Sequence, residues 1–510
     1  MLAIVKSTAL YGLEGRLVQV EVDVANGLPS FDLVGLPDAA VREARDRVRA
    51  ALKNSGFDFP AKRITVNLAP ADLKKEGPLY DLPIAAGILA ATGQIDHLKL
   101  LPYVLMGELS LDGTLREISG TLPNVLVARE QNLTEVIVPA QNANEASLVQ
   151  GVNIYPVTSL NQMDRFLRQE NEIKPWQADI TTLMTAHHQE YLDMADIRGQ
   201  EAARRALEVA AAGGHNILMI GSPGTGKTML ARRLPGILPD LSFEEAIEVT
   251  KIHSLAGLLK PNYPLVKARP FRAPHHTAST ASLVGGGHFP RPGEISLAHL
   301  GVLFLDEMPE FRKDALESLR APLEDGIVTI SRVSTTVAYP AQIMLVGACN
   351  PCPCGYYGDS QRACSCTPNQ IQRYLSRISG PLLDRIDLHL EVPRVAYQEL
   401  SAKEPGEPSA VIKKRVQAAR RRQQERLGLK NTCNARLKPN EVRKYCHLTI
   451  DARALLAAAF RQLHLSARAH DRILKVALTI ADLAQSEIIE AAHLAEAIQY
   501  RNLESKYYLS

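Results

Sequence analysis

The sequence predicts an α/β protein with a mixed α/β N-terminal domain, a central parallel sheet covered by helices, and an all-helical C-terminal domain. Short, strongly apolar strands in the middle of the chain predict the parallel sheet, because strands of that kind are buried on both faces. Strands and helices alternate before them, and only helical patterns follow Pro408. We expect domains at 1–168, 196–400 and 401–510 and a linker at 169–195.

Composition and charge exclude several classes of protein. Hydrophobic residues make up 46% and charged residues 22% of the 510 positions, and no apolar stretch approaches the roughly 20 residues of a membrane helix. Residues 1–10 lack the apolar core of a signal peptide, so we expect a cytoplasmic protein with no membrane partner. The net charge of +3 is unevenly spread, since residues 401–510 carry 20 Lys or Arg against 11 Asp or Glu.

The N-terminal domain has clear local signals. Residues 18–24 alternate valine with polar residues, which predicts a half-buried strand. A helical pattern runs from Asp38 to Gly56, and glycine commonly follows the last turn of a helix. Further strands are expected at 63–68 and 135–138, and a further helix at 81–92.

The central domain is expected to contain three apolar strands, at 216–221, 301–305 and 342–347. Between the first two, Ser242 and Glu245 have the spacing of a capping box, which predicts the start of a helix. Four helices are predicted in the C-terminal domain, at 411–430, 449–463, 466–484 and 486–503.

A glycine-rich loop, GSPGTGKT, lies between the first apolar strand and a helix. Its glycines let successive backbone N–H groups turn toward phosphate oxygens, while Lys227 neutralises the β and γ phosphates and Thr228 offers an oxygen to Mg²⁺. In this context the pattern predicts a P-loop that binds ATP. The expected ATP contacts are Gly221, Ser222, Pro223, Gly224, Thr225, Gly226, Lys227, Thr228 and Met229.

The ends of the next two apolar strands carry polar groups suited to ATP hydrolysis. Asp306 and Glu307 follow the second strand, where Asp306 would hold Mg²⁺ and Glu307 would polarise the attacking water. Asn350 follows the third, where its amide can bond both the γ-phosphate and that water. Arg385 lies between two aspartates, and taken alone this pattern favours a surface salt bridge.

Five of the seven cysteines fall within residues 349–366. Four of them form two Cys-x-Cys pairs, which can supply four thiolates to one Zn²⁺ and so pin the loop that follows the third strand. Cys-x-Cys spacing is tighter than the usual two-residue gap, and free thiols in a loop are the alternative. The four candidate ligands are Cys352, Cys354, Cys364 and Cys366.

Together these motifs resemble the AAA+ ATPases of the magnesium-chelatase-like group, over residues 196–503. The resemblance implies that Ile197 lies on the adenine side, that Asn350 is sensor 1, and that Arg468 is a sensor 2 arginine on the helical domain. It also implies that Arg385 is an arginine finger, which reaches the γ-phosphate of the neighbouring subunit in a ring. The family's insert before the Walker B strand is matched at 283–287 and 292–299.

Residues 1–165 resemble the Lon-protease-like domain, an α/β fold of the ribosomal S5 domain 2 type. An active Lon domain needs a serine after Gly-Pro and a lysine in a later helix. Here Leu79 follows Gly-Pro, and Pro123 follows Gly-Thr-Leu, so both the nucleophile and the activating amine are missing. We therefore expect no peptidase activity.

Two basic features are candidates for DNA contacts. Residues 326–342 predict a β-hairpin with Arg332 near its tip, which either follows a DNA backbone in the pore of a ring or discourages edge-strand aggregation. Lys413, Lys414 and Arg415 begin a helix with seven cations, which either contacts phosphates or presents a solvated or subunit-contacting face.

With these domains in this order, the whole chain resembles the ComM family of competence proteins. The resemblance implies a hexameric DNA motor, with ATP and Mg²⁺ as cofactors, that promotes branch migration when incoming DNA is recombined during natural transformation. The recombinase machinery would be a further partner. Two alternatives stay open: a chelatase-type motor for metal insertion into a porphyrin, and an AAA+ protein remodeller. DNA-stimulated ATPase activity would separate the motor from both.

Overall fold

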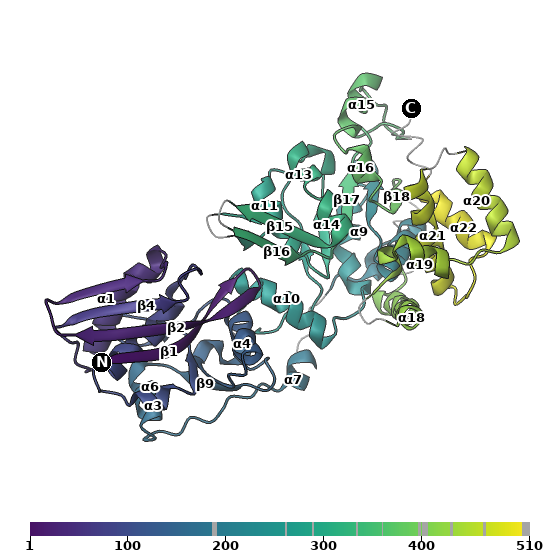
Figure 1. The fold of residues 1–510 in the computed structure, drawn as a ribbon. Coiled ribbons are helices and arrows are strands. Elements are labelled where there is room, and N and C mark those ends of the chain that lie inside the picture. The colour runs from purple at the N-terminus through teal and green to yellow at the C-terminus, as the bar shows by residue number, and fades with distance from the viewer. Residues whose placement is uncertain are drawn as a thin grey trace. The chain divides into compact units, whose positions relative to one another are not determined.

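The chain folds into two compact units, residues 1–187 with 246–267 and residues 188–245 with 268–510. In the part of the chain that the structure describes, no helix is long and apolar enough to cross a membrane. The structure is a computed structural model (Figure 1). It describes all residues except 186–190, 261–262, 288–289, 333–334, 360, 396–398, 400–405, 429–431, 463–465 and 502–510.

The first unit is built on a seven-stranded sheet with the order β3-β4-β2-β1-β5-β8-β9. Neighbours β4, β2 and β1 are antiparallel, whereas β1, β5, β8 and β9 run parallel. Valines 18, 20 and 22 of β2 are fully buried, as the alternating pattern predicts. The strands are β1 (Leu2–Tyr11), β2 (Glu14–Ala25), β3 (Ser30–Val34), β4 (Arg63–Ala69), β5 (Tyr103–Leu105), β8 (Glu135–Pro139) and β9 (Asn153–Val157), with a separate pair β6 (Glu108–Leu109) and β7 (Leu115–Arg116).

Helices α1 and α2 form much of the core of this unit. The predicted start of α1 is confirmed, because the Asp38 carboxylate accepts a hydrogen bond of 2.7 Å from the backbone N–H of Val41. Every residue of α2 is buried, and α2 packs on β1 and β2. The helices of this unit are α1 (Ala39–Asn54), α2 (Asp81–Ala91), α3 (His97–Leu100), α4 (Thr121–Glu130), α5 (Ala143–Ala146), α6 (Leu160–Leu167) and α7 (Ile180–Thr185).

Helix α10 (Phe243–Leu255) begins in the second unit and continues into the first. Its predicted capping box is present: Ser242 Oγ accepts from the backbone N–H of Glu245 at 3.2 Å, and Glu245 Oε2 accepts from that of Ser242 at 3.0 Å. At the other end, the hydroxyl of Ser254 donates to the buried carboxylate of Glu145. Residues 246–267 are thereby bonded into the first unit.

The second unit contains a five-stranded, wholly parallel sheet with the order β11-β14-β17-β10-β18. All residues of β10, β14 and β17 are buried, which confirms the parallel sheet predicted from apolar strands. Because parallel strands end at the same edge, the carboxyl ends of these three neighbours lie side by side. The strands are β10 (Ile217–Ile220), β11 (Phe271–Arg272), β14 (Val302–Leu305), β17 (Met344–Cys349) and β18 (Leu388–Glu391).

Short elements fill the connections of this sheet. A hairpin of β15 and β16 precedes β17, as predicted, and is antiparallel throughout. Its strands are β15 (Ile327–Arg332) and β16 (Thr335–Pro340), and the other short pair is β12 (Gly285–Gly286) with β13 (Arg291–Pro292). The helices are α8 (Glu201–Gly213), α9 (Lys227–Arg233), α11 (Thr280–Val284), α12 (Glu294–Leu297), α13 (Lys313–Glu317), α14 (Arg320–Asp325), α15 (Pro368–Leu375) and α16 (Gly380–Leu383).

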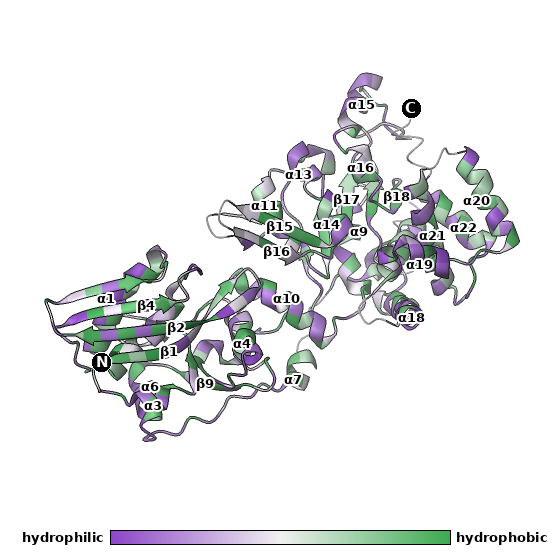
Figure 2. Cartoon of the chain, viewed as in Figure 1, coloured by the Kyte–Doolittle hydropathy of each residue, from purple (hydrophilic) through white to green (hydrophobic). Residues whose placement is uncertain are grey.

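The C-terminal part of the described chain is helical, as predicted. Its first two helices are largely hydrophilic (Figure 2). Helix α22 begins at Ala491, five residues later than expected, because Glu490 is its N-cap and Ile489 still bonds to the loop before α20. The helices are α18 (Ser409–Leu427), α19 (Pro439–Tyr445), α20 (Ile450–Gln462), α21 (Ala467–Leu483) and α22 (Ala491–Gln499).

Candidate nucleotide-binding site

The glycine-rich loop connects β10 to α9 and has the conformation that a P-loop requires. Gly224 and Gly226 have φ angles of +79° and +87°, in the left-handed region that glycine adopts without strain. A Cβ atom on Gly221 would lie 2.3 Å from the backbone oxygen of Val392, so this position also needs glycine. A larger residue at these three positions would therefore either strain the backbone or clash with Val392.

Lys227 is buried at the centre of the loop. Its Nζ donates to the backbone oxygens of Gly221 at 2.6 Å and Ser222 at 3.0 Å. Burial lowers the pKa of Lys227, because the ammonium has lost much of its hydration. A phosphate in the loop would supply the counter-charge that favours the ammonium form.

Two oxygens suited to Mg²⁺ meet beside the loop. Thr228 Oγ1 donates to Asp306 Oδ2 at 2.7 Å, which joins the start of α9 to the end of β14. Hydroxyl and carboxylate oxygens are ligands that Mg²⁺ prefers, so the pair fits the expected metal. The other carboxylate oxygen, Asp306 Oδ1, accepts from the backbone N–H of Glu307 at 3.0 Å.

Glu307 follows Asp306 in an uncommon backbone conformation. Its φ is +49°, a value that is rare for residues other than glycine and that often marks functional sites. The side chain is 56% exposed, and its carboxylate lies 3.5 Å from Nδ1 of His276. The carboxylate is thus accessible to a water molecule, as a general base must be. The sequence gave no signal that His276 would lie beside Glu307.

Asn350, at the end of β17, is brought to the same place. Its Oδ1 accepts from Lys227 Nζ at 3.3 Å, and its backbone lies near the hydroxyl of Tyr374. Burial raises the pKa of Tyr374 above its usual range, so this hydroxyl stays neutral. The neighbouring thiol of Cys349 is also buried, and its pKa is raised to about 12.

The entry motif is connected to the loop through its last residue. Gln200 Nε2 donates to the backbone oxygen of Thr225 at 2.6 Å. Ile197 is fully buried in the core of this unit, and Met229 is 39% exposed on α9. Contacts of Ile197 and Met229 with ATP stay predictions.

The two predicted arginines lie elsewhere in this unit. Arg385 donates to the backbone oxygen of Pro381 at 2.8 Å and forms an ion pair with Glu324. Arg468 is exposed in the first turn of α21. Their roles as arginine finger and sensor 2 stay predictions.

Asp387, two residues after Arg385, has a role that the sequence did not reveal. Its carboxylate is 4% exposed, forms an ion pair with Arg472 of α21 and accepts from the backbone N–H of Asn216 at 3.1 Å. Burial alone would raise its pKa, but Arg472 and His215 together hold the pKa of Asp387 well below its usual range. In a sequence, an aspartate beside an arginine is typical of a surface ion pair. Only the fold shows that Asp387 is buried.

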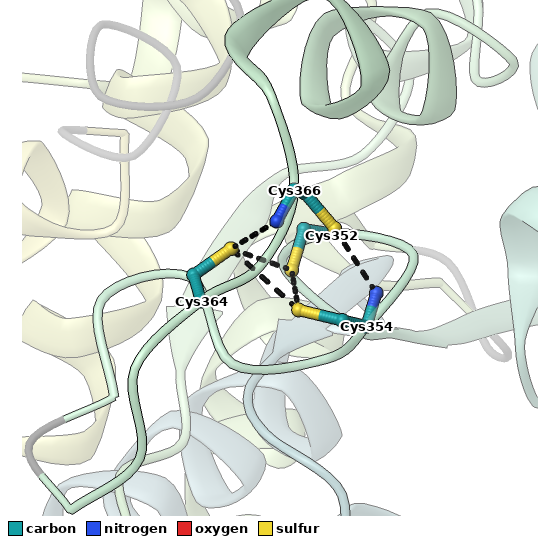
Figure 3. Close-up of side chains that lie close together, drawn as sticks. All are labelled: Cys352, Cys354, Cys364 and Cys366. Carbon is teal, nitrogen blue, oxygen red and sulfur yellow. Dashed lines mark hydrogen bonds between the residues drawn. The ribbon is translucent and has the colours of Figure 1, made fainter.

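The four clustered cysteines lie together, with their sulfur atoms pointing toward one another (Figure 3). The Sγ–Sγ distances are 3.3 Å between Cys352 and Cys354, 3.7 Å between Cys352 and Cys364, and 3.5 Å between Cys354 and Cys364. With Cys366, all four sulfur atoms lie within 4.8 Å of one another, and all four cysteines are free thiols. The cluster can hold a metal ion.

The candidate DNA contacts have different surroundings. Arg332 pairs in register with Thr335 at the end of the hairpin, and its side chain lies outside the described residues. On α18, Lys413 Nζ lies 2.6 Å from Asp240 Oδ1, and Arg415 forms ion pairs with Glu208 and Glu407. Lys413 and Arg415 are thus matched by carboxylates of their own chain, whereas Lys414 is exposed. DNA contacts of all four predicted residues stay predictions.

Comparison with known proteins identifies the family. Residues 193–400 match the family described as magnesium chelatase, subunit ChlI; residues 20–142 match subunit ChlI of Mg-chelatase, and residues 406–501 its C-terminal part. The chain is 48% identical to competence protein ComM of Haemophilus influenzae, with 98% of this chain and 97% of that protein covered. It is 47% identical to YifB of Escherichia coli, an uncharacterized protein, over 99% and 97% of the two chains.

The chain belongs to the ComM/YifB family. A third member, the uncharacterized Rv2897c of Mycobacterium tuberculosis, is 44% identical over 97% of each chain. The ComM/YifB family is magnesium-chelatase-like and AAA+ in type, which implies ATP and Mg²⁺ as ligands of the P-loop. That implication agrees with the geometry of Lys227, Thr228 and Asp306.

Proposed function

We propose that the protein is an ATP-dependent DNA motor, a hexameric ring in the cytoplasm that promotes branch migration during homologous recombination of incoming DNA in natural transformation. The single observation that carries the ATPase part is the meeting of Lys227, Thr228, Asp306 and Asn350 at the carboxyl edge of one sheet. The full-length similarity to a competence protein supports the DNA part.

In the proposed hydrolysis step, Lys227 and the loop N–H groups hold the β and γ phosphates, and Asn350 orients the attacking water. Glu307 accepts a proton of that water as its oxygen attacks the γ-phosphorus, the bond to the bridging β-phosphate oxygen breaks, and ADP and phosphate leave. Thr228 and Asp306 would hold Mg²⁺, which neutralises charge on the phosphate oxygens.

Assembly into a ring explains why Arg385 does not need to reach its own P-loop. We propose that Arg385 leaves Glu324 and reaches the γ-phosphate bound to the neighbouring subunit, while Arg468 contacts nucleotide within its own subunit. Hydrolysis then depends on assembly, because the transition state is incomplete in an isolated chain.

DNA would pass through the ring beside the β15–β16 hairpin. We assign Arg332 and the exposed Lys414 as backbone contacts, since each neutralised phosphate contributes to affinity regardless of base sequence. Lys413 and Arg415 would contribute only if DNA displaced their carboxylate partners. The recombinase machinery is the proposed further partner.

The test is displacement of a labelled strand from a three-stranded recombination intermediate in ATP and Mg²⁺. Wild type and Glu307→Gln are compared, with Glu310→Gln as the matched control because Glu310 pairs with Arg377 at 2.9 Å and faces no ligand in our assignment. We expect wild type and Glu310→Gln to move the strand and Glu307→Gln to be inactive. If none moves it and DNA leaves ATPase activity unchanged, the motor is refuted, and a chelatase-type motor or a protein remodeller becomes the better reading.

A further inference from the structure

The four-cysteine cluster has the dimensions of a tetrahedral metal site. With metal–sulfur bonds of about 2.3 Å, as in zinc–thiolate sites, the edges of the sulfur tetrahedron measure about 3.8 Å. The three edges among Cys352, Cys354 and Cys364 are 3.3, 3.7 and 3.5 Å, close to that value. Four sulfur ligands without oxygen or nitrogen favour Zn²⁺ over Mg²⁺ or Ca²⁺.

Backbone N–H groups around the cluster point at sulfur atoms. The N–H of Tyr357 donates to Cys352 at 3.3 Å, that of Cys354 to Cys366 at 3.4 Å, and that of Cys366 to Cys364 at 3.4 Å. Such bonds stabilise thiolate charge and orient the ligands, as the surroundings of a metal site do. The loop is therefore arranged around its sulfur atoms.

We propose that Cys352, Cys354, Cys364 and Cys366 hold one Zn²⁺, and that the metal-bound loop buttresses the P-loop, so that nucleotide affinity depends on the metal. This inference rests on the proposed function, because it concerns regulation of the same nucleotide site. It goes beyond that function by assigning the cysteine loop a role in ATP binding.

The loop touches the P-loop at two neighbouring residues. A Cβ atom on Gly355 would lie 2.6 Å from Cδ of Pro223, so the loop backbone rests directly against the proline. Next to it, the carboxylate of Asp359 accepts from Arg394 Nε at 2.8 Å, and the nearby hydroxyl of Ser222 lowers the pKa of Asp359. The segment between the two cysteine pairs thus packs on Pro223 and places a carboxylate near Ser222.

The end of the same loop leads into α15, the helix that lies next to Asn350. Thr367 follows the last cysteine and caps α15 with a complete capping box. Helix α15 carries Tyr374, whose hydroxyl lies near the backbone of Asn350. Displacement of Cys366 would therefore disturb the helix that lies beside the proposed sensor.

Apart from the bonds of Asp359 and the contact of Arg362 with Tyr356, the described part of the loop has no regular structure that would keep it folded. No helix or strand lies between β17 and α15 in the described residues, and only Cys352 among the four ligands is fully buried. A metal bound by four thiolates supplies folding free energy to segments of this kind directly. Without the metal, the segment that contacts Pro223 and lies near Ser222 would be an unsupported turn.

The first experiment counts zinc in the purified full-length protein by mass spectrometry and compares Cys364→Ser with Cys446→Ser. Cys446 lies on the C-terminal side of α19, away from the cluster, and controls for the loss of a thiol. We expect one zinc per chain in wild type and Cys446→Ser and a loss of zinc in Cys364→Ser. Wild type without zinc and with four titratable free thiols in the loop would overturn the site.

The second experiment measures binding of a fluorescent ATP analogue in excess Mg²⁺, before and after removal of zinc with a zinc-selective chelator. We expect binding to weaken about tenfold without zinc, since the loop that packs on Pro223 and places the Asp359 carboxylate near Ser222 loses its support. The variant Asp359→Asn tests the effect of the loop on the P-loop with the four cysteines intact. It should keep its zinc and still bind the analogue several-fold more weakly than wild type. Equal affinity with and without zinc, or an unchanged Asp359→Asn, would overturn the coupling.

The two proposals fail in different ways. If zinc-loaded wild type does not bind the analogue at all, the proposed ATPase function fails, while the zinc count still decides the metal site. If zinc-loaded and zinc-free protein bind and hydrolyse ATP equally, the motor stands and the buttress is refuted.

Discussion

Asp387→Asn is the substitution that tests most directly how the second unit is held together. The carboxylate joins three parts of the chain: it forms an ion pair with Arg472 of α21, lies 3.4 Å from Nδ1 of His215 after α8, and accepts from the backbone N–H of Asn216 before β10. Asparagine keeps the shape but removes the charge. Arg472 then faces a neutral amide in a site that is only partly open to water.

The expected cost follows from burial. Breaking a buried ion pair by removing one partner costs about 3–5 kcal/mol. The lower end applies here, because the Arg472 side chain is 23% exposed and recovers part of its hydration. We therefore expect a loss of about 3 kcal/mol of unfolding free energy at pH 7, roughly a hundredfold in the ratio of folded to unfolded unit.

The pH dependence gives a second signature. The pKa of Asp387 is lower in the folded state than in the unfolded chain. The ionised carboxylate therefore stabilises the fold above the unfolded pKa of about 4, and this stabilisation is lost as the pH falls further. The difference in unfolding free energy between wild type and variant should therefore decrease by about 1 kcal/mol as the pH falls from about 4 to about 3. The variant itself has no proton to gain at this position.

Hydrogen exchange of peptides that cover β10 and β18 is the suitable assay. Trp176, the only tryptophan, belongs to the first unit, so its fluorescence does not follow unfolding of the second. Asp314→Asn is the control, because Asp314 forms an exposed pair with Arg312 and should cost less than about 1 kcal/mol. Equal effects of the two substitutions, or a difference that does not narrow in acid, would refute the reasoning.

Three further outcomes are expected. Glu307→Gln should lower kcat for phosphate release by about 10²–10⁴ and leave the affinity for ATP unchanged; a rate within threefold of wild type would exclude Glu307 as general base. Thr228→Ala should raise the Mg²⁺ concentration needed for half-maximal hydrolysis, and an unchanged Mg²⁺ titration would contradict its assignment. Ser242→Ala should cost about 1 kcal/mol through loss of the cap, seen as faster exchange in the first turn of α10 and nowhere else in that helix.

Local signals predicted many of the elements, because their causes are local. The capping box at Ser242 and the cap at Asp38 lie within three residues of the groups they bond, and the valines of 18–24 alternate within one strand. The long strand β1 was not predicted, although it lies beside β2 in the sheet. Its residues 2–10 mix apolar and polar types without strict alternation, so period alone does not identify them.

The site was predictable where a motif is continuous and not where it is assembled from distant parts. The P-loop and the Asp306–Glu307 pair each occupy one stretch of sequence, and the sheet then joins them. Asp359 and His276 reach the site only through the course of their loops, and nothing in the sequence around either one indicates proximity to the nucleotide site. The cysteine spacing did suggest a metal, but not the contact of that loop with Pro223.

The order of the strands explains where control of this site can enter. Strand β17 lies between β10 and β14, so hydrogen bonds on both sides fix the end that carries Asn350. The return from β17 to β18 has no such support: it contains the cysteine loop, α15 and α16, and it leads to Arg385. Any ligand that stiffens this return acts on Asn350 at one end and on Arg385 at the other. A metal in the cysteine loop is therefore well placed to influence both nucleotide binding in one chain and the proposed arginine contact to its neighbour.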